Sequence, residues 1–109
     1  MTFIVGNTTV IGPTGTIVTY RLSNSNISAN TSANSGYHYI ASSKLTLTLP
    51  STPTVGDVVG FSNQASAGSV IARNGNNING FAEDLIIDRT WIAIRLQYSS
   101  NSTLGWVFV

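Results

Sequence analysis

KLTLTLP, at residues 44–50, is the stretch of sequence that decides the fold of this chain. Leu45, Leu47 and Leu49 alternate with two threonines, so in an extended strand the leucines share one face and the threonines share the other. Pro50 has no N–H to donate to a neighbouring strand, and it therefore ends the run. The stretch predicts a β-strand with one buried face and one exposed face.

Similar strand patterns recur along the chain, and Gly, Pro, Asn and Ser separate them. In WIAIRLQY, at 91–98, alternation places Ile92, Ile94, Leu96 and Tyr98 on one face. No segment has the period of a long helix. The other predicted strands are FIV (3–5), TTVI (8–11), TIVTYRL (16–22), YHYIAS (37–42), DVVGFS (57–62), SVIAR (69–73), DLIID (84–88) and WVFV (106–109). Roughly eight to ten short strands predict an all-β fold, a small antiparallel β-sandwich or barrel-like domain.

The chain divides into three regions that differ in composition. Residues 1–22 carry N-terminal strands and form a possible docking arm. Residues 23–36, SNSNISANTSANSG, are uncharged and of low complexity, so we expect an exposed loop or a partly mobile arm. Residues 37–109 form the β-sandwich body, in which NGNN (74–77) and Asn79–Gly80 supply turn residues that tolerate positive φ. We therefore expect hairpins and meanders to link neighbouring strands.

Composition limits the classes of partner. Charged residues make up 8% of the chain, against about 25% in a typical globular protein, and the formal net charge is +1. Nucleic acid and anionic lipid both require clustered Lys and Arg, so neither is expected as a partner. The chain has no cysteine, which excludes disulfides and thiolate metal sites. The first residues lack the features of a signal peptide, and we expect a soluble protein made in the cytoplasm.

The titratable residues do not form a catalytic pattern. Glu83 and Asp84 are adjacent, so in a strand they point to opposite faces, and Asp84 and Asp88 would stand about 13 Å apart. His38 is the single histidine, which is too few for a histidine-rich metal site, and no nucleophile-elbow motif accompanies it. The sequence predicts no enzyme, no metal and no cofactor, with carboxylates that hold turns or face solvent.

The C-terminal strand is apolar on both faces, since Trp106 and Phe108 oppose Val107 and Val109. Two-sided apolarity at the ends of a small domain suggests burial against neighbouring subunits. Aromatic residues and Arg are enriched at interface cores. The predicted subunit interface therefore consists of Trp91, Arg95, Trp106 and Phe108. The alternative is a sugar-stacking platform of exposed rings, formed by Tyr37, Tyr39, Trp91, Tyr98 and Trp106.

Three segments in order, LTLTLPSTPTVGDVVGF (45–61), IARNGNNINGFAEDLIID (71–88) and GWVFV (105–109), resemble a β-rich module of tailed-bacteriophage virion proteins, found in fibres and head appendages. The shared features are an alternating Leu–Thr strand, a Pro turn into Gly–Asp, an Arg–Asn–Gly hairpin, an Ala–Glu–Asp–Leu strand and a terminal Gly–Trp. The resemblance covers residues 43–109. It implies a homotrimer, and it implies that Glu83 and Asp84 belong to the scaffold.

The resemblance leaves two functions open. Because only about forty residues precede the match, without the shaft of a fibre, we expect a head decoration or cement protein on the outer surface of the virion. Its trimers would bridge subunits of the major capsid protein, with Phe3, Ile4 and Val5 extending a partner's sheet edge or pairing within their own domain. The alternative is a short tail-fibre or spike module that binds host-surface carbohydrate. A lectin or hydrolase unconnected with phage would require a polar pocket that the sequence does not indicate.

Overall fold

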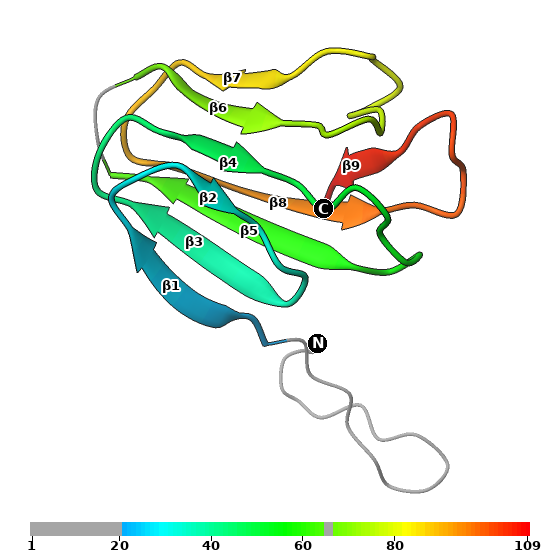
Figure 1. The fold of residues 1–109 in the computed structure, drawn as a ribbon, viewed down its shortest axis with the longest axis horizontal. Coiled ribbons are helices and arrows are strands. Elements are labelled where there is room, and N and C mark those ends of the chain that lie inside the picture. The colour runs from blue at the N-terminus through cyan, green and yellow to red at the C-terminus, as the bar shows by residue number, and fades with distance from the viewer. Residues whose placement is uncertain (1–20, 65–66) are drawn as a thin grey trace, which may run out of the picture.

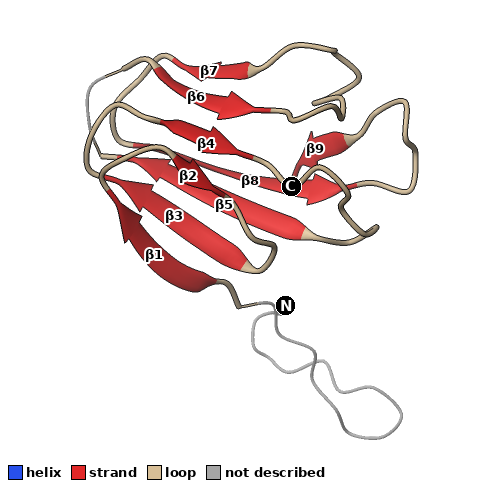
Figure 2. Cartoon of the chain, viewed as in Figure 1, coloured by secondary structure: helices blue, strands red, loops and turns tan. Residues whose placement is uncertain are grey.

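The protein, seen here as a computed structural model that describes residues 21–64 and 67–109, stacks two β-sheets face to face (Figure 1). Within those residues the secondary structure is entirely strand and loop (Figure 2). The all-β prediction is therefore confirmed. The five-stranded sheet has the order β1 (Ser23–Ile27), β3 (Tyr37–Ala41), β5 (Val58–Asn63), β8 (Ile92–Tyr98) and β9 (Trp106–Phe108). The four-stranded sheet has the order β2 (Thr31–Ser32), β4 (Thr46–Thr48), β6 (Ser69–Ala72) and β7 (Leu85–Ile87).

The chain winds between the two sheets. From β1 to β6 each strand lies in the sheet opposite the strand before it, so β1, β3 and β5 run parallel, and β2, β4 and β6 also run parallel. Antiparallel pairing begins only with β7, β8 and β9. The prediction of an antiparallel sandwich was therefore wrong for the first six strands. Turn residues such as Gly36, whose φ is +88°, make corners that carry the chain across to the other sheet.

The core lies between the sheets, where the alternating residues of both meet. Leu47 is fully buried and lies beside Ile71 of β6, while Phe61 of β5 lies beside Ile94 of β8. Thr46 and Thr48, which flank Leu47, stay partly exposed on the opposite face. The observed burial of residues 44–50 thus confirms the predicted inward and outward faces.

Residues 23–36, predicted to be a loop, instead contain β1 and β2. β1 pairs in parallel with β3, and Ser23 N–H donates to Gly36 O at 2.9 Å. Backbone pairing needs no apolar side chain, so an edge strand can be rich in Ser and Asn, and most of these side chains remain exposed. The strands predicted at 3–5 and 8–11 lie outside the described residues, and of 16–22 only Arg21 and Leu22 are described, both outside any strand.

The β6–β7 loop, residues 73–84, contains the two predicted Asn–Gly turns. Asn74, Gly75, Asn79 and Gly80 all have positive φ, as type I′ turns require. Phe81 N–H donates to Ile78 O at 2.9 Å across the second turn. The loop is tied to β9, because Trp106 N–H donates to Asn77 O at 2.8 Å and Asn79 N–H donates to Trp106 O at 2.7 Å. The loop therefore covers the start of β9.

Candidate functional site

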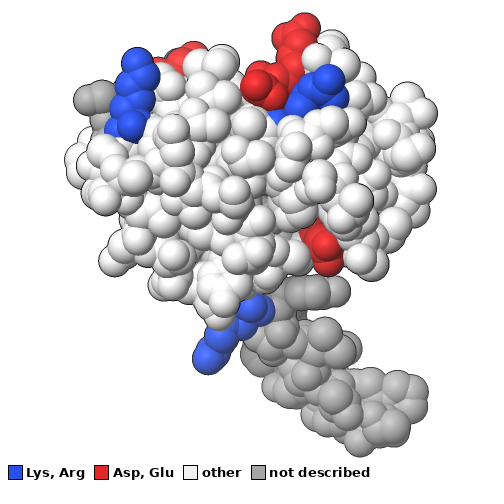
Figure 3. Space-filling view, viewed as in Figure 1, with Lys and Arg blue, Asp and Glu red and all other residues white. Residues whose placement is uncertain are grey.

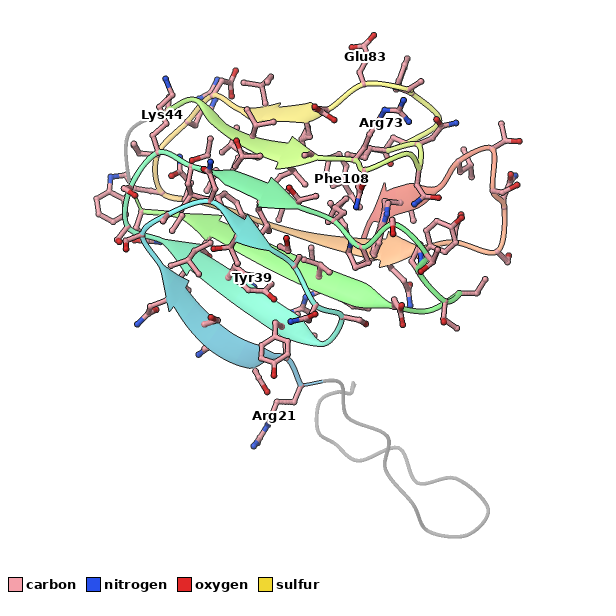
Figure 4. All side chains as sticks on the ribbon, in the orientation of Figure 1. Arg21, Tyr39, Lys44, Arg73, Glu83 and Phe108 are labelled. Carbon is pink, nitrogen blue, oxygen red and sulfur yellow. The ribbon has the colours of Figure 1, made fainter. Side chains whose placement is uncertain are left out.

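Two of the four carboxylates, those of Asp57 and Asp84, hold turns, as the sequence predicted. Asp84 Oδ1 accepts a hydrogen bond from Arg73 N–H at 2.9 Å, and Asp57 Oδ2 accepts one from Thr54 N–H at 2.8 Å. Glu83 points outward from the β6–β7 loop (Figure 4). Across residues 21–64 and 67–109 no three His, Asp or Glu side chains gather closely enough to hold a metal ion. Asp57 and Asp84 thus stabilise the backbone of the turns in which they lie.

His38 lies on the outward face of β3, and its ring covers Gly60 of β5. Nε2 of His38 forms a hydrogen bond of 2.8 Å with Ser62 Oγ. A Cβ on Gly60 would collide with Nδ1 of the ring, so the absence of a side chain there makes room for it. Burial, followed by the positive charge of Arg95, lowers the pKa of His38 below its usual value of 6.5.

This lowered pKa predicts a pH-dependent stability. Because the unfolded chain binds the His38 proton more readily than the folded chain does, unfolding becomes easier as the pH falls from 6.5 through the folded-state pKa. We expect His38→Gln, which keeps a polar group near Ser62 and cannot titrate, to lose less stability than wild type over that interval. Urea unfolding at several pH values measures the difference. Identical pH profiles for the two proteins would contradict the prediction.

An apolar groove opens where the two sheets end, between β7 and the β8–β9 pair. Its volume is about 320 Å³, and its lining is Leu85, Ile86, Ile87, Asp88, Ile92, Ile94 and Phe108. A second hollow of about 180 Å³ continues it past Ile78 and Phe81. Phe108 lies beside β9 in the space between the ribbons of the two sheets (Figure 4). Residues of core character thus line a surface that residues 21–64 and 67–109 leave open.

The topology explains why the groove is open. In the described residues β7 and β9 are the last strands of their sheets, and β7 lines the groove from one side while Phe108 of β9 lines it from the other. The β6–β7 loop covers Trp106 at the start of β9, but Phe108 remains 49% exposed. The inner face of the five-stranded sheet is therefore covered at one end of β9 and uncovered at the other.

β8 also has a free edge beside the groove. β9 pairs with β8 along Leu96–Tyr98, and Val109 N–H adds a bond to Arg95 O at 3.0 Å. Among the described residues no strand pairs with Ile92–Ile94 on that side. Unpaired edges next to apolar surface invite strand pairing with another chain. The groove and this edge together form the strongest candidate interaction surface.

The predicted interface residues lie in three different places. Trp106 is fully buried in its own chain, with its ring edge-on to Tyr98 at 5.4 Å, so its assignment to a subunit interface was wrong. Phe108 lines the groove. Arg95 lies on the outer face of the five-stranded sheet, and Trp91 is 77% exposed just before β8. The docking residues Phe3, Ile4 and Val5 lie outside the described residues.

The aromatic platform of five rings is not formed. Tyr39 is buried and its hydroxyl accepts a hydrogen bond from Asn34 N–H at 2.7 Å, while Trp106 belongs to the core. Trp91 alone of the five is strongly exposed. Conversely, sequence reasoning missed Ile86, which is 57% exposed at the groove. The signal for it was the unbroken apolar run of β7, which leaves no polar face for solvent.

No protein-family profile and no curated protein matches this chain. In the described residues no helix is long and apolar enough to cross a membrane. The visible face of the molecule is largely uncharged, with its Lys, Arg, Asp and Glu mostly near the periphery (Figure 3).

Proposed function

We propose that this chain is a structural protein of a tailed-phage virion, a head decoration or cement protein that assembles as a homotrimer on the outer surface of the head. The observation that carries the proposal is the open apolar groove between β7 and Phe108, because residues of core character in that position call for a covering chain. The role is structural and not enzymatic. Its partners are other copies of the chain and the major capsid protein, and neither nucleic acid nor membrane is among them.

The proposed mechanism is multivalent clamping. A trimer whose copies cover each other's grooves presents three identical outer surfaces, and each can contact a different capsid subunit. Several modest contacts then act together, so dissociation requires breaking all of them. The low charge of the chain suits dense packing, since strongly charged copies would repel each other.

Undecorated capsids test the virion role. Purified protein should bind them saturably, and the decorated capsids should withstand a higher temperature before disruption than bare capsids do. Light scattering during heating gives the disruption temperature. The absence of saturable binding to capsids of the cognate phage would count against the head role while leaving self-association open.

A charge placed in the groove should weaken self-association. We expect Ile86→Asp to raise the dissociation constant between copies at least about tenfold, because the carboxylate must be desolvated when a partner covers it. Sedimentation velocity over a concentration series measures the change. The matched control is Val55→Asp, whose side chain is comparably exposed, at 60% against 57% for Ile86, in the turn before β5. Equal effects of the two substitutions would show that the groove is not the contact.

The second candidate is a tail-fibre or spike module that binds host-surface carbohydrate. The observation in its favour is Trp91, a large ring that stands mostly in solvent. Rings that stack on sugars present an apolar face to the ligand while their surroundings remain wet. Cell-binding assays on host and non-host bacteria distinguish this function from head decoration.

A further inference from the structure

The outer face of the five-stranded sheet has a floor of small residues. Gly60 and Ser62 face outward on the central strand β5, and Ala93 lies beside Ser62 on β8. His38 and Arg95 stand on either side of Gly60, in the same row across the sheet. A shallow hollow of about 330 Å³, lined in part by His38, Ala93 and Arg95, opens on this side of the molecule. The face is thus a furrow that is open beside Ala93 and Arg95, while over Gly60 it is occupied by the His38 ring, which also bonds to Ser62.

At one end of this furrow a row of exposed residues crosses the sheet. Ile27, Ala41, Asn63 and Ile92 lie side by side at the ends of their strands, with inward-facing side chains. The next residues along this direction, beyond the strand ends, are Ser28, Ser42, Gln64 and Trp91. All four are exposed. Neutral hydroxyl and amide groups thus flank the indole ring in this row.

The backbone holds Trp91 in a strained conformation. Its φ is +59°, a left-handed value that costs a residue with a side chain about 1–2 kcal/mol. Trp91 N–H donates to Asn63 O at 2.7 Å, and Asn63 Nδ2 donates to Arg89 O at 2.6 Å. Asn63 is itself fully buried, so a core side chain fixes the turn at 89–91. The ring itself is 77% exposed and is not held by the core, and strained backbone conformations of this kind cluster at binding sites.

The surroundings of Trp91 fit a sugar better than they fit a protein partner. A protein interface core would surround an aromatic anchor with apolar side chains. Here the neighbouring row supplies hydroxyl and amide groups, which donate and accept hydrogen bonds as sugar hydroxyls do. The exposed Asp88 and Arg89, three and two residues before Trp91, carry opposite charges, so the turn that holds the ring has no net charge and suits a neutral ligand.

We propose that the end of the five-stranded sheet beside Trp91 binds a neutral oligosaccharide, with Trp91 stacked on one pyranose ring. Gln64 and Ser42 bind hydroxyl groups beside that ring, and Ser28 stands at the far end of the same row. The row from β1 to β8 spans three interstrand spacings, or about 14 Å, which leaves room for more than one sugar unit. The site does not depend on whether the chain is located on the head or on a fibre.

Fluorescence titration tests the proposal directly, since Trp106 is buried and Trp91 is the exposed tryptophan. The probes are maltohexaose, cellohexaose, mannohexaose and chitohexaose. We expect a saturable change in emission with at least one of them and at least about a tenfold loss of affinity in Gln64→Ala. Trp91→Ala, followed by calorimetry because it lacks the reporter ring, should lose binding altogether. Phe81→Ala removes an exposed ring from the groove side and should bind as wild type does.

The outcomes separate this site from the groove. Thermal unfolding of Trp91→Ala should match that of wild type, since the ring packs in no core, and its mass in solution should also be unchanged. Wild-type affinity in both Trp91→Ala and Gln64→Ala would overturn the proposal, as would four flat titrations of the wild type. Either result would leave self-association through the groove untouched, because that depends on Ile86 and Phe108.

Discussion

Replacing Leu47 by alanine is expected to lower the free energy of unfolding by about 2–5 kcal/mol, the usual cost of a large-to-small change in a core. Leu47 is fully buried on the central part of the four-stranded sheet, with Ile71 beside it on β6. The cavity would lie between the two sheets, where strands paired on both sides limit relaxation. Chemical denaturation with urea measures the loss.

Leu104→Ala is the matched control for that substitution. Leu104 lies in the turn between β8 and β9 and is 42% exposed, so the same chemical change should cost less than about 1 kcal/mol. Similar losses for the two leucines would mean that the alternation in residues 44–50 does not separate a buried face from an exposed one.

Gly105→Ala adds one methyl group and is expected to lower the free energy of unfolding by about 3 kcal/mol or more. Gly105 has a φ of +70°, and a Cβ there would collide with the backbone oxygen of Asn77. That oxygen also accepts the bond from Trp106 N–H, so backbone atoms and not a flexible side chain must move. The β6–β7 loop would separate from β9 and uncover Trp106. Loss of a cooperative thermal transition, or a large fall in its midpoint, is the expected result.

Gly36→Ala measures how much of the loss comes from placing an alanine at a positive φ without any collision. Gly36 has a comparable φ of +88°, but a Cβ there meets nothing within 4 Å. Its cost should therefore be limited to the left-handed conformation, about 1–2 kcal/mol. If Gly105→Ala lowered the free energy of unfolding no more than Gly36→Ala does, the β6–β7 loop could not lie as close to β9 as described.

Local alternation made seven of the nine strands in the described residues predictable. The runs around Leu47, Phe61 and Ile94 bury one face and expose the other, and that pattern needs no knowledge of the neighbours. The same pattern does not say in which sheet the next strand lies. Parallel winding from β1 to β6 was missed for that reason, because the corner residues are the same types that form hairpins.

β1 and β2 were missed because their residues carry no strand pattern. Their backbones pair with β3 and β4, whereas the side chains of Ser23, Asn24 and Asn26 stay in solvent. Edge strands need only one neighbour, and a low-complexity sequence can supply the pairing groups. Pairing with neighbouring strands therefore gives this segment a β structure that its composition does not indicate.

The different burial of Trp106 and Phe108 is a feature of the candidate site that the sequence could not predict. They share one face of β9, and their sequence pattern is the same, yet one is fully buried and the other is half exposed. The difference comes from the β6–β7 loop, which lies more than twenty residues earlier in the chain and covers only the start of the strand. Alternation identifies the face, and long-range contacts determine its burial.

Sedimentation equilibrium of the unmodified protein at micromolar concentration tests the central claim most directly, that further copies of the chain cover the groove beside Phe108. The proposed homotrimer predicts a mass three times that of the 11.5 kDa chain, with dissociation in Ile86→Asp. A single-chain mass throughout the micromolar range would contradict the account, because no further copy of the chain would then cover the groove.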